Sequence, residues 1–112
     1  MATITPVAPG VPVSSVTPVT PNATDQIDAR PYTVIFLVIV SSTGTPTVTV
    51  TDQASAAPAG LTFSGNTVSS GALTSGQTKV MRLDASRFRD VNGYIQIATA
   101  SPANSTVYAF GI

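Results

Sequence analysis

The strongest constraint on the fold lies in residues 32–40, which read Tyr-Thr-Val-Ile-Phe-Leu-Val-Ile-Val. Side chains that are aromatic or branched at Cβ favour an extended strand, because they fit the pleated surface of a sheet. Apolar side chains occupy both odd and even positions, so both faces of this strand need cover. One face can pack into the core of the domain, and the other needs a second layer, a long loop or a neighbouring subunit. The run is shorter than the ~20 residues that a membrane-spanning helix requires.

Shorter runs of alternating or β-branched residues recur at spacings near ten residues along the remaining chain. We expect residues 41–46 to form a turn that joins residues 32–40 and 47–51 into an antiparallel hairpin. Asp84 could cap one helical turn between residues 84 and 92. The pattern predicts an all-β fold, a small antiparallel β-sandwich or barrel of six to seven strands. The shorter candidate strands are residues 47–51, 61–63, 67–68, 79–83, 94–98 and 106–112.

Residues 1–24 carry no charge and contain five of the nine prolines, which predicts extended geometry without internal hydrogen bonds. We therefore divide the chain into an extended arm, residues 1–24, and a β-sandwich domain, residues 25–112. The arm is either a disordered tail or a segment that becomes ordered along another protein, and fully extended it could reach a neighbouring subunit. The start of the chain lacks the basic and apolar regions of a secretory signal. The candidate contact residues of the arm are Val7, Val11, Val13, Val16 and Val19.

The residue inventory argues against catalysis and against a bound cofactor or metal. The chain contains no histidine, cysteine or glutamate, so general acid-base chemistry would depend on aspartate, one lysine and three tyrosines. Asp25 and Asp28 resemble part of a calcium loop, but the other oxygen ligands and the glycine of that pattern are missing. Turn chemistry, or capping of a short first strand, explains the two aspartates better. We expect no enzymatic activity, no cofactor and no metal site.

Charged residues make up only 9% of the chain and the net charge is zero. No overall field attracts nucleic acid or an anionic membrane, and we expect neither as a partner. A hydroxyl-rich surface with few charges suits packing into an assembly, although a monomer with a threonine-rich sheet surface is the other interpretation.

Four of the five basic residues fall between positions 79 and 89. This cluster is either a solvated edge with local ion pairs or a contact for an acidic protein. Nucleic-acid binding is the third interpretation, but aspartates interrupt the cluster and it contains one aromatic residue. We take Arg87, Phe88 and Arg89 as candidate interface residues.

Residues 25–112 carry a series of short strand and turn features in a fixed order. They are residues 32–40, the hairpin at residues 47–51, Gly60-Leu61 before Asn66-Thr67-Val68, Ser75-Gly76-Gln77-Thr78, residues 88–94 (Phe-Arg-Asp-Val-Asn-Gly-Tyr) and the last strand. The order of these features resembles small virion proteins of tailed bacteriophages, of the capsid decoration (cement) type. The resemblance implies a structural protein that binds an assembled capsid and braces it. It also implies the major capsid protein as partner, a homo-oligomer with a trimer favoured, and a place on the capsid surface of the virion after synthesis in the host cytoplasm.

Two other functions remain open on the sequence. One is a head-fibre or adhesin-like module that recognises cell-surface glycans, although the chain has no tryptophan on which a sugar could stack. The other is a structural component of the tail or neck.

Overall fold

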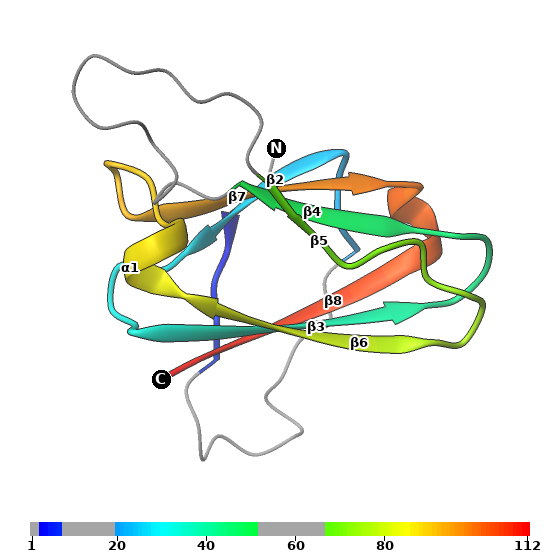
Figure 1. Cartoon of the computed structure of the whole chain (residues 1–112), viewed down its shortest axis with the longest axis horizontal. Coiled ribbons are helices and arrows are strands. Elements are labelled where there is room, and N and C mark those ends of the chain that lie inside the picture. The colour runs from blue at the N-terminus through cyan, green and yellow to red at the C-terminus, as the bar shows by residue number, and fades with distance from the viewer. Residues whose placement is uncertain (1–2, 8–19, 52–66) are drawn as a thin grey trace.

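The computed structural model describes residues 3–7, 20–51 and 67–112, and these residues form two facing β-sheets (Figure 1). One sheet has five strands in the order β1-β2-β7-β4-β5, and the other has three in the order β6-β3-β8. The predicted all-β sandwich is therefore confirmed. Its elements are β1 (Thr3–Ile4), β2 (Thr24–Asp28), β3 (Val34–Ser41), β4 (Thr47–Thr51), β5 (Thr67–Ser69), β6 (Thr78–Asp84), α1 (Ala85–Phe88), β7 (Tyr94–Ala100), the 3₁₀ turn η3 (Pro102–Asn104) and β8 (Ser105–Gly111).

Strand β3 is the centre of the three-stranded sheet and pairs antiparallel with both β6 and β8. Its alternate side chains Ile35, Leu37 and Ile39 are fully buried between the sheets. In the other set, Phe36, Val38 and Val40 point away from the core and are only half-buried. One face of the central strand is therefore covered by the second sheet, as expected. The other face, for which the sequence predicts a second layer, a long loop or a neighbouring subunit, is half-buried at Phe36, Val38 and Val40.

The core is built by alternation along the strands of both sheets. The predicted inward positions Val48 and Val50 on β4, and Ile95 and Ile97 on β7, are buried. On β6, Met81 and Leu83 face the core, whereas Val80 on the other face of the strand is 56% exposed. The cluster of buried apolar residues also includes Ile4, Ile27, Ala29, Leu73, Ala85, Phe88, Val107 and Ala109.

The predicted hairpin between residues 32–40 and 47–51 is wrong, because β3 and β4 lie in different sheets. Strand β4 pairs antiparallel with β5 and β7. The connection crosses from one sheet to the other with Pro46 buried, and the carbonyl of Pro46 accepts a hydrogen bond from the Leu73 N–H at 3.0 Å. Alternation fixes which side chains face the core, but a sandwich has two sheets that can supply that face, so periodicity alone does not identify the pairing partner.

The first described residues belong to the sandwich. Strand β1 pairs parallel with β2, and the side chain of Ile4 is 3% exposed. Further along the same segment, Val7 forms a parallel bridge with Phe110 of β8. Residues 3–7 thus cross from the five-stranded sheet to the three-stranded sheet (Figure 1). The predicted arm therefore differs at residues 3–7, while its residues 8–19 lie outside the described part of the chain.

The predicted helical turn is present as α1, which follows β6 directly. Asp84 occupies the N-cap position, but its side chain makes no capping hydrogen bond. Its carboxylate instead lies 3.4 Å from the guanidinium of Arg82. The expected cap by Asp84 is therefore wrong.

The burial of Ile4 gives a test of whether the N-terminal segment belongs to the fold. Substitution of Ile4→Ala removes buried methyl groups, and we expect a loss of about 2–4 kcal/mol in the free energy of unfolding. The matched change at the exposed neighbour, Thr5→Ala, should alter it by no more than about 0.5 kcal/mol. Urea denaturation measures both. Equal, negligible effects of the two substitutions would show that residues 3–7 do not pack on the domain.

Candidate interaction surface

The outer face of the three-stranded sheet carries a continuous set of apolar side chains. The registers of β3 place Phe36 between Arg82 and Phe110, and Val38 between Val80 and Tyr108. A third row carries Val40 between two threonines. We call the apolar members of these rows the apolar face: Phe36, Val38, Val40, Val80, Tyr108 and Phe110.

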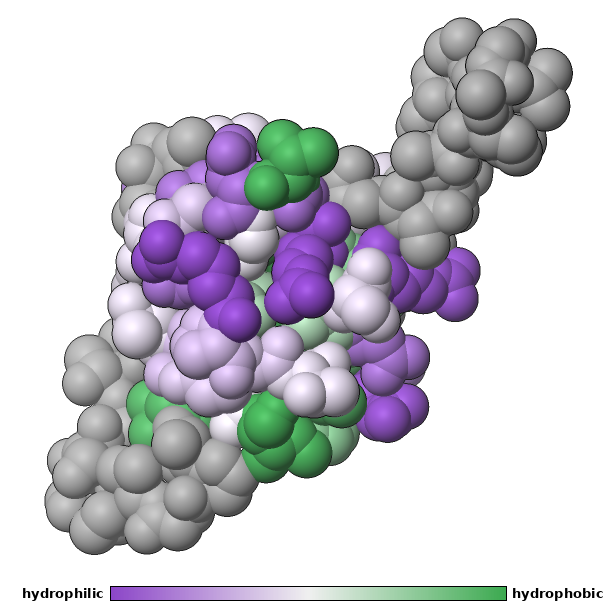
Figure 2. All heavy atoms as spheres, turned by 90° about the vertical axis from the view of Figure 1, so that its left-hand side faces the viewer, coloured by the Kyte–Doolittle hydropathy of each residue, from purple (hydrophilic) through white to green (hydrophobic). Residues whose placement is uncertain are grey.

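The outer face of the five-stranded sheet has the opposite character. In the end view of Figure 2, the hydrophobic residues lie mostly on the lower side, where Figure 1 places the three-stranded sheet. One smaller hydrophobic group lies at the top. Burial alternates along β2, β4 and β7, and the outward positions of these strands are polar or small: Thr24, Gln26, Asp28, Thr47, Thr49, Thr51, Tyr94, Gln96, Ala98 and Ala100. The sandwich therefore has one polar and one apolar outer face.

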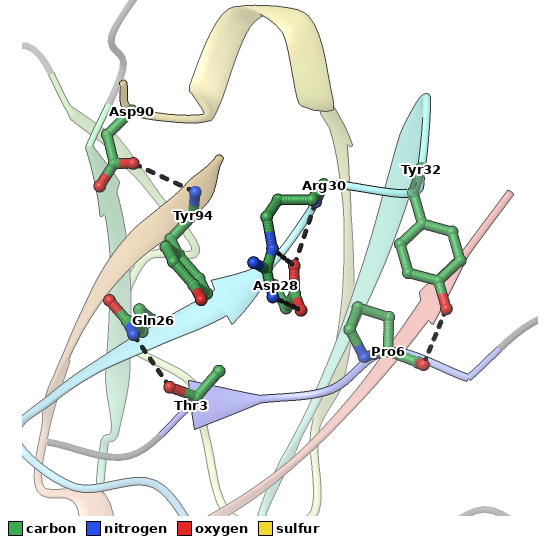
Figure 3. A network of polar contacts seen from close by, with 8 residues as sticks. All are labelled: Thr3, Pro6, Gln26, Asp28, Arg30, Tyr32, Asp90 and Tyr94. Atoms are coloured by element: carbon green, nitrogen blue, oxygen red, sulfur yellow. Dashed lines mark hydrogen bonds and ion pairs between the residues drawn. The ribbon is translucent and has the colours of Figure 1, made fainter. Parts of the chain in front are cut away.

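A polar cluster lies on the five-stranded sheet where β2 and β7 pair (Figure 3). The guanidinium of Arg30 donates to both carboxylate oxygens of Asp28, at 2.9 and 2.8 Å. The hydrogen bonds from Arg30 are the main reason that the pKa of Asp28 is lowered. The same guanidinium lies 5.0 Å from the ring centroid of Tyr94. Arg30 therefore covers one face of the ring on which a sugar could otherwise stack.

Asp90 holds the tight turn between α1 and β7. Its carboxylate accepts hydrogen bonds from the backbone N–H groups of Asn92 and Tyr94, at 2.9 and 3.1 Å. The side-chain amide of Gln96 donates to its other oxygen at 2.8 Å. Burial raises the pKa of the Asp90 carboxyl, but these hydrogen bonds outweigh burial and lower the pKa overall. The ionised form therefore stabilises the turn.

The predicted contact residues are spread over different environments. Phe88 is a core residue, 6% exposed, and its side chain belongs to the main hydrophobic cluster. Arg87 and Arg89 on either side of it are exposed, and the Arg87 guanidinium lies 5.5 Å from the Phe88 ring. Val7 is half-buried and uses its backbone N–H and carbonyl on β8. The remaining predicted contacts lie outside the described residues: Val11, Val13, Val16 and Val19.

The apolar face was not among the contacts expected from the sequence, although part of its signal was present. Residues 32–40 are apolar at both odd and even positions, and Tyr108 and Phe110 share one face of the last strand. The sequence did not show that the aromatic set of each strand would point outward. Only the register, in which Phe36 lies beside Phe110, brings these side chains together on one surface.

The two aspartates that resembled part of a calcium loop lie in different environments. Asp25 is buried and accepts hydrogen bonds from the backbone and side chain of Asn22, at 2.7 and 3.0 Å, whereas Asp28 is paired with Arg30 on the outer face. Over residues 3–7, 20–51 and 67–112, no group of three or more histidine, cysteine, aspartate or glutamate side chains is placed to hold a metal ion. The same residues include no helix long and apolar enough to span a membrane.

Comparison with protein-family models, curated proteins and solved structures finds no match. The function is therefore inferred from the chain's own residues and from their arrangement.

The lowered pKa values of Asp28 and Asp90 give a pH test of the polar cluster. A carboxyl whose pKa is lower in the folded chain than in the unfolded chain, about 3.9, stabilises the fold above that pH. The stabilisation is lost as the pH falls through the folded-state pKa. We expect the melting temperature to fall below about pH 4, and to fall less steeply for Asp90→Asn, which has no carboxyl to protonate. Thermal melting between neutral and acidic pH measures this, and parallel profiles for the two chains would contradict it.

Proposed function

We propose that the chain is a structural protein of a bacteriophage virion that binds and stabilises the assembled capsid, and that the apolar face is its contact surface. The observation that carries the proposal is the asymmetry of the sandwich. One sheet presents hydroxyl, amide and small side chains to the outside, and the other presents Phe36, Tyr108, Phe110 and valines. Of the apolar face, Val80 is 56% exposed and the other members are half-buried. Apolar side chains that reach the surface as a group are typical of protein contact sites.

The apolar face is too small to form a stable interface by itself, which favours a protein that makes the same contact several times. Strand β3 forms seven residue pairs with each of β6 and β8. With strands about 4.8 Å apart and a rise of about 3.4 Å per residue, these three strands cover roughly 300–350 Å². A stable single interface buries about 800 Å² on each partner. At about 25 cal/mol per Å² of apolar area, a face of this size supplies at most about 9 kcal/mol before the costs of association, and less because Arg82 and two threonines occupy part of it. It therefore suits a subunit that is held at several equivalent points.

The resemblance to capsid decoration proteins implies a partner that offers several equivalent binding points. A capsid repeats the same surface many times, so modest contacts combine through avidity when the bound subunits are themselves joined. We take the major capsid protein as the partner of the apolar face and a homo-oligomer, with a trimer favoured, as the bound form. Binding of the apolar face to the shell removes Phe36 and its neighbours from water, and this burial provides the binding free energy.

Substitution of Val38→Asp at the centre of the apolar face tests the proposal. The aspartate would place a charge in a desolvated contact, so we expect at least a ~10-fold loss of affinity for capsids. Co-sedimentation of the purified chain with capsids that lack it measures the binding, and circular dichroism confirms that the variant is folded.

Thr49→Asp is the matched control, because Thr49 is also half-buried, lies mid-strand and points outward from the other sheet. Its capsid binding should remain unchanged. If Thr49→Asp abolishes binding and Val38→Asp does not, the polar sheet is the contact surface. If the wild-type chain does not sediment with capsids at all, the proposed function is wrong.

A further inference from the structure

Residues 3–7 occupy a socket at the edge of the sandwich. The socket is formed by β2 on one side, by β8 on the other, and by Tyr32 between them (Figure 3). We call these elements the edge socket. Residues 3–7 join the two sheets, because they pair with β2 of one sheet and with β8 of the other.

The backbone of the occupant is bound as an added strand. Thr3 and Ile4 pair parallel with Gln26 and Ile27 of β2. Further along, the Val7 N–H donates to the carbonyl of Ala109 at 2.9 Å, and the Gly111 N–H donates to the carbonyl of Val7 at 3.0 Å. Peptides that add a strand to a sheet edge gain affinity from such backbone bonds.

The side chains of the occupant give the socket its specificity. Ile4 is 3% exposed and joins the main hydrophobic cluster, and Pro6 is buried. The Tyr32 hydroxyl donates to the carbonyl of Pro6 at 3.1 Å, and the Gln26 amide donates to the Thr3 hydroxyl at 2.9 Å. The socket therefore recognises an extended Thr-Ile-Thr-Pro-Val segment through a buried isoleucine and two polar side-chain contacts.

We propose that the edge socket also binds residues 3–7 of a second copy of this chain, so that two copies exchange their first strands. Each named contact joins the segment to residues at least 23 positions away, so an identical segment from a neighbour would satisfy all of them. The exchange is reciprocal, and both sockets remain filled. Such an exchange is a low-cost route to association between identical chains.

The connection to β2 sets the concentration at which exchange occurs. Twelve residues, 8–19, separate the segment from the next described residues, and three of them are prolines: Pro9, Pro12 and Pro18. A segment of twelve residues can extend to about 37 Å at ~3.1 Å per residue. This length is comparable with the diameter of the whole chain of 112 residues as a compact sphere, which is ~34 Å. The chain's own segment competes at an effective concentration in the millimolar range, so exchange requires neighbours at a similar density. An assembly in which many copies of this chain lie side by side provides that density.

The absence of cysteine makes the exchange directly measurable by disulfide trapping. Chains with Thr3→Cys and chains with Gln26→Cys are unfolded, mixed and refolded together, and then oxidised and separated on a non-reducing gel. Paired residues on neighbouring strands lie about 4.8 Å apart, within the range that a disulfide bridges. We expect a mixed disulfide dimer whose yield rises between ~10 µM and ~1 mM protein.

Three controls make the outcome decisive. A chain that carries both cysteines should close an internal disulfide at low concentration, and failure to do so would show that the socket does not hold residue 3. Adding Ile4→Asp to the Thr3→Cys chain should remove the mixed dimer, because the aspartate cannot enter the core. Thr67→Cys, exposed on β5 at the opposite edge of the sheet, should capture Thr3→Cys about tenfold less well than Gln26→Cys does.

A mixed dimer no more abundant than the Thr67→Cys control at both concentrations would overturn the exchange. The experiment uses the purified chain alone, so its result does not depend on whether the chain binds capsids.

Discussion

The structure depends on the pairing of one strand, β3, with its two neighbours β6 and β8. Its inward side chains, Ile35, Leu37 and Ile39, are fully buried and form the centre of the core. Because β3 is also apolar on its other side, and because β6 and β8 flank it, the outward side chains of three strands meet on one surface. The core and the apolar face are therefore two consequences of the same apolar run, residues 32–40.

The second sheet covers only one side of β3 and turns a polar surface outward. Its outward residues are stabilised locally, by the Asp28–Arg30 pair and by the hydrogen bonds to Asp90. These contacts pair the charged groups of Asp28, Arg30 and Asp90 with near neighbours and leave the aromatic ring of Tyr94 partly covered. The polar sheet has the features of a solvated surface, and the apolar sheet has those of a contact surface, which is the basis of the proposed assembly function.

The sequence predicts the inward residues of single strands better than it predicts how the strands pair. Periodicity gave the inward residues of β4 and β7 correctly, because alternation depends only on burial of one face. It did not give the pairing of β4, since both sheets offer an inward face. Prolines and the lack of charge predict an extended arm over residues 1–24, and this signal is stronger than that of Ile4, which enters the core.

The candidate surface was harder to predict than the fold for a related reason. Arg87 and Arg89 are exposed as a charged cluster predicts, but Phe88 between them is needed by the core. The apolar face consists of residues from three strands that are distant in sequence, and only the register places Phe36 next to Phe110. A pattern within one segment cannot show such a surface, because its members become neighbours only after folding.

Hydroxyl-radical footprinting of the chain, free and bound to capsids, tests the central claim most directly. Phe36, Tyr108 and Phe110 of the apolar face and Tyr94 of the polar sheet are aromatic residues whose oxidation can be followed by mass spectrometry. The account predicts that binding protects the three residues of the apolar face and leaves the oxidation of Tyr94 unchanged. Protection of Tyr94 with undiminished oxidation of Phe36, Tyr108 and Phe110 would contradict it.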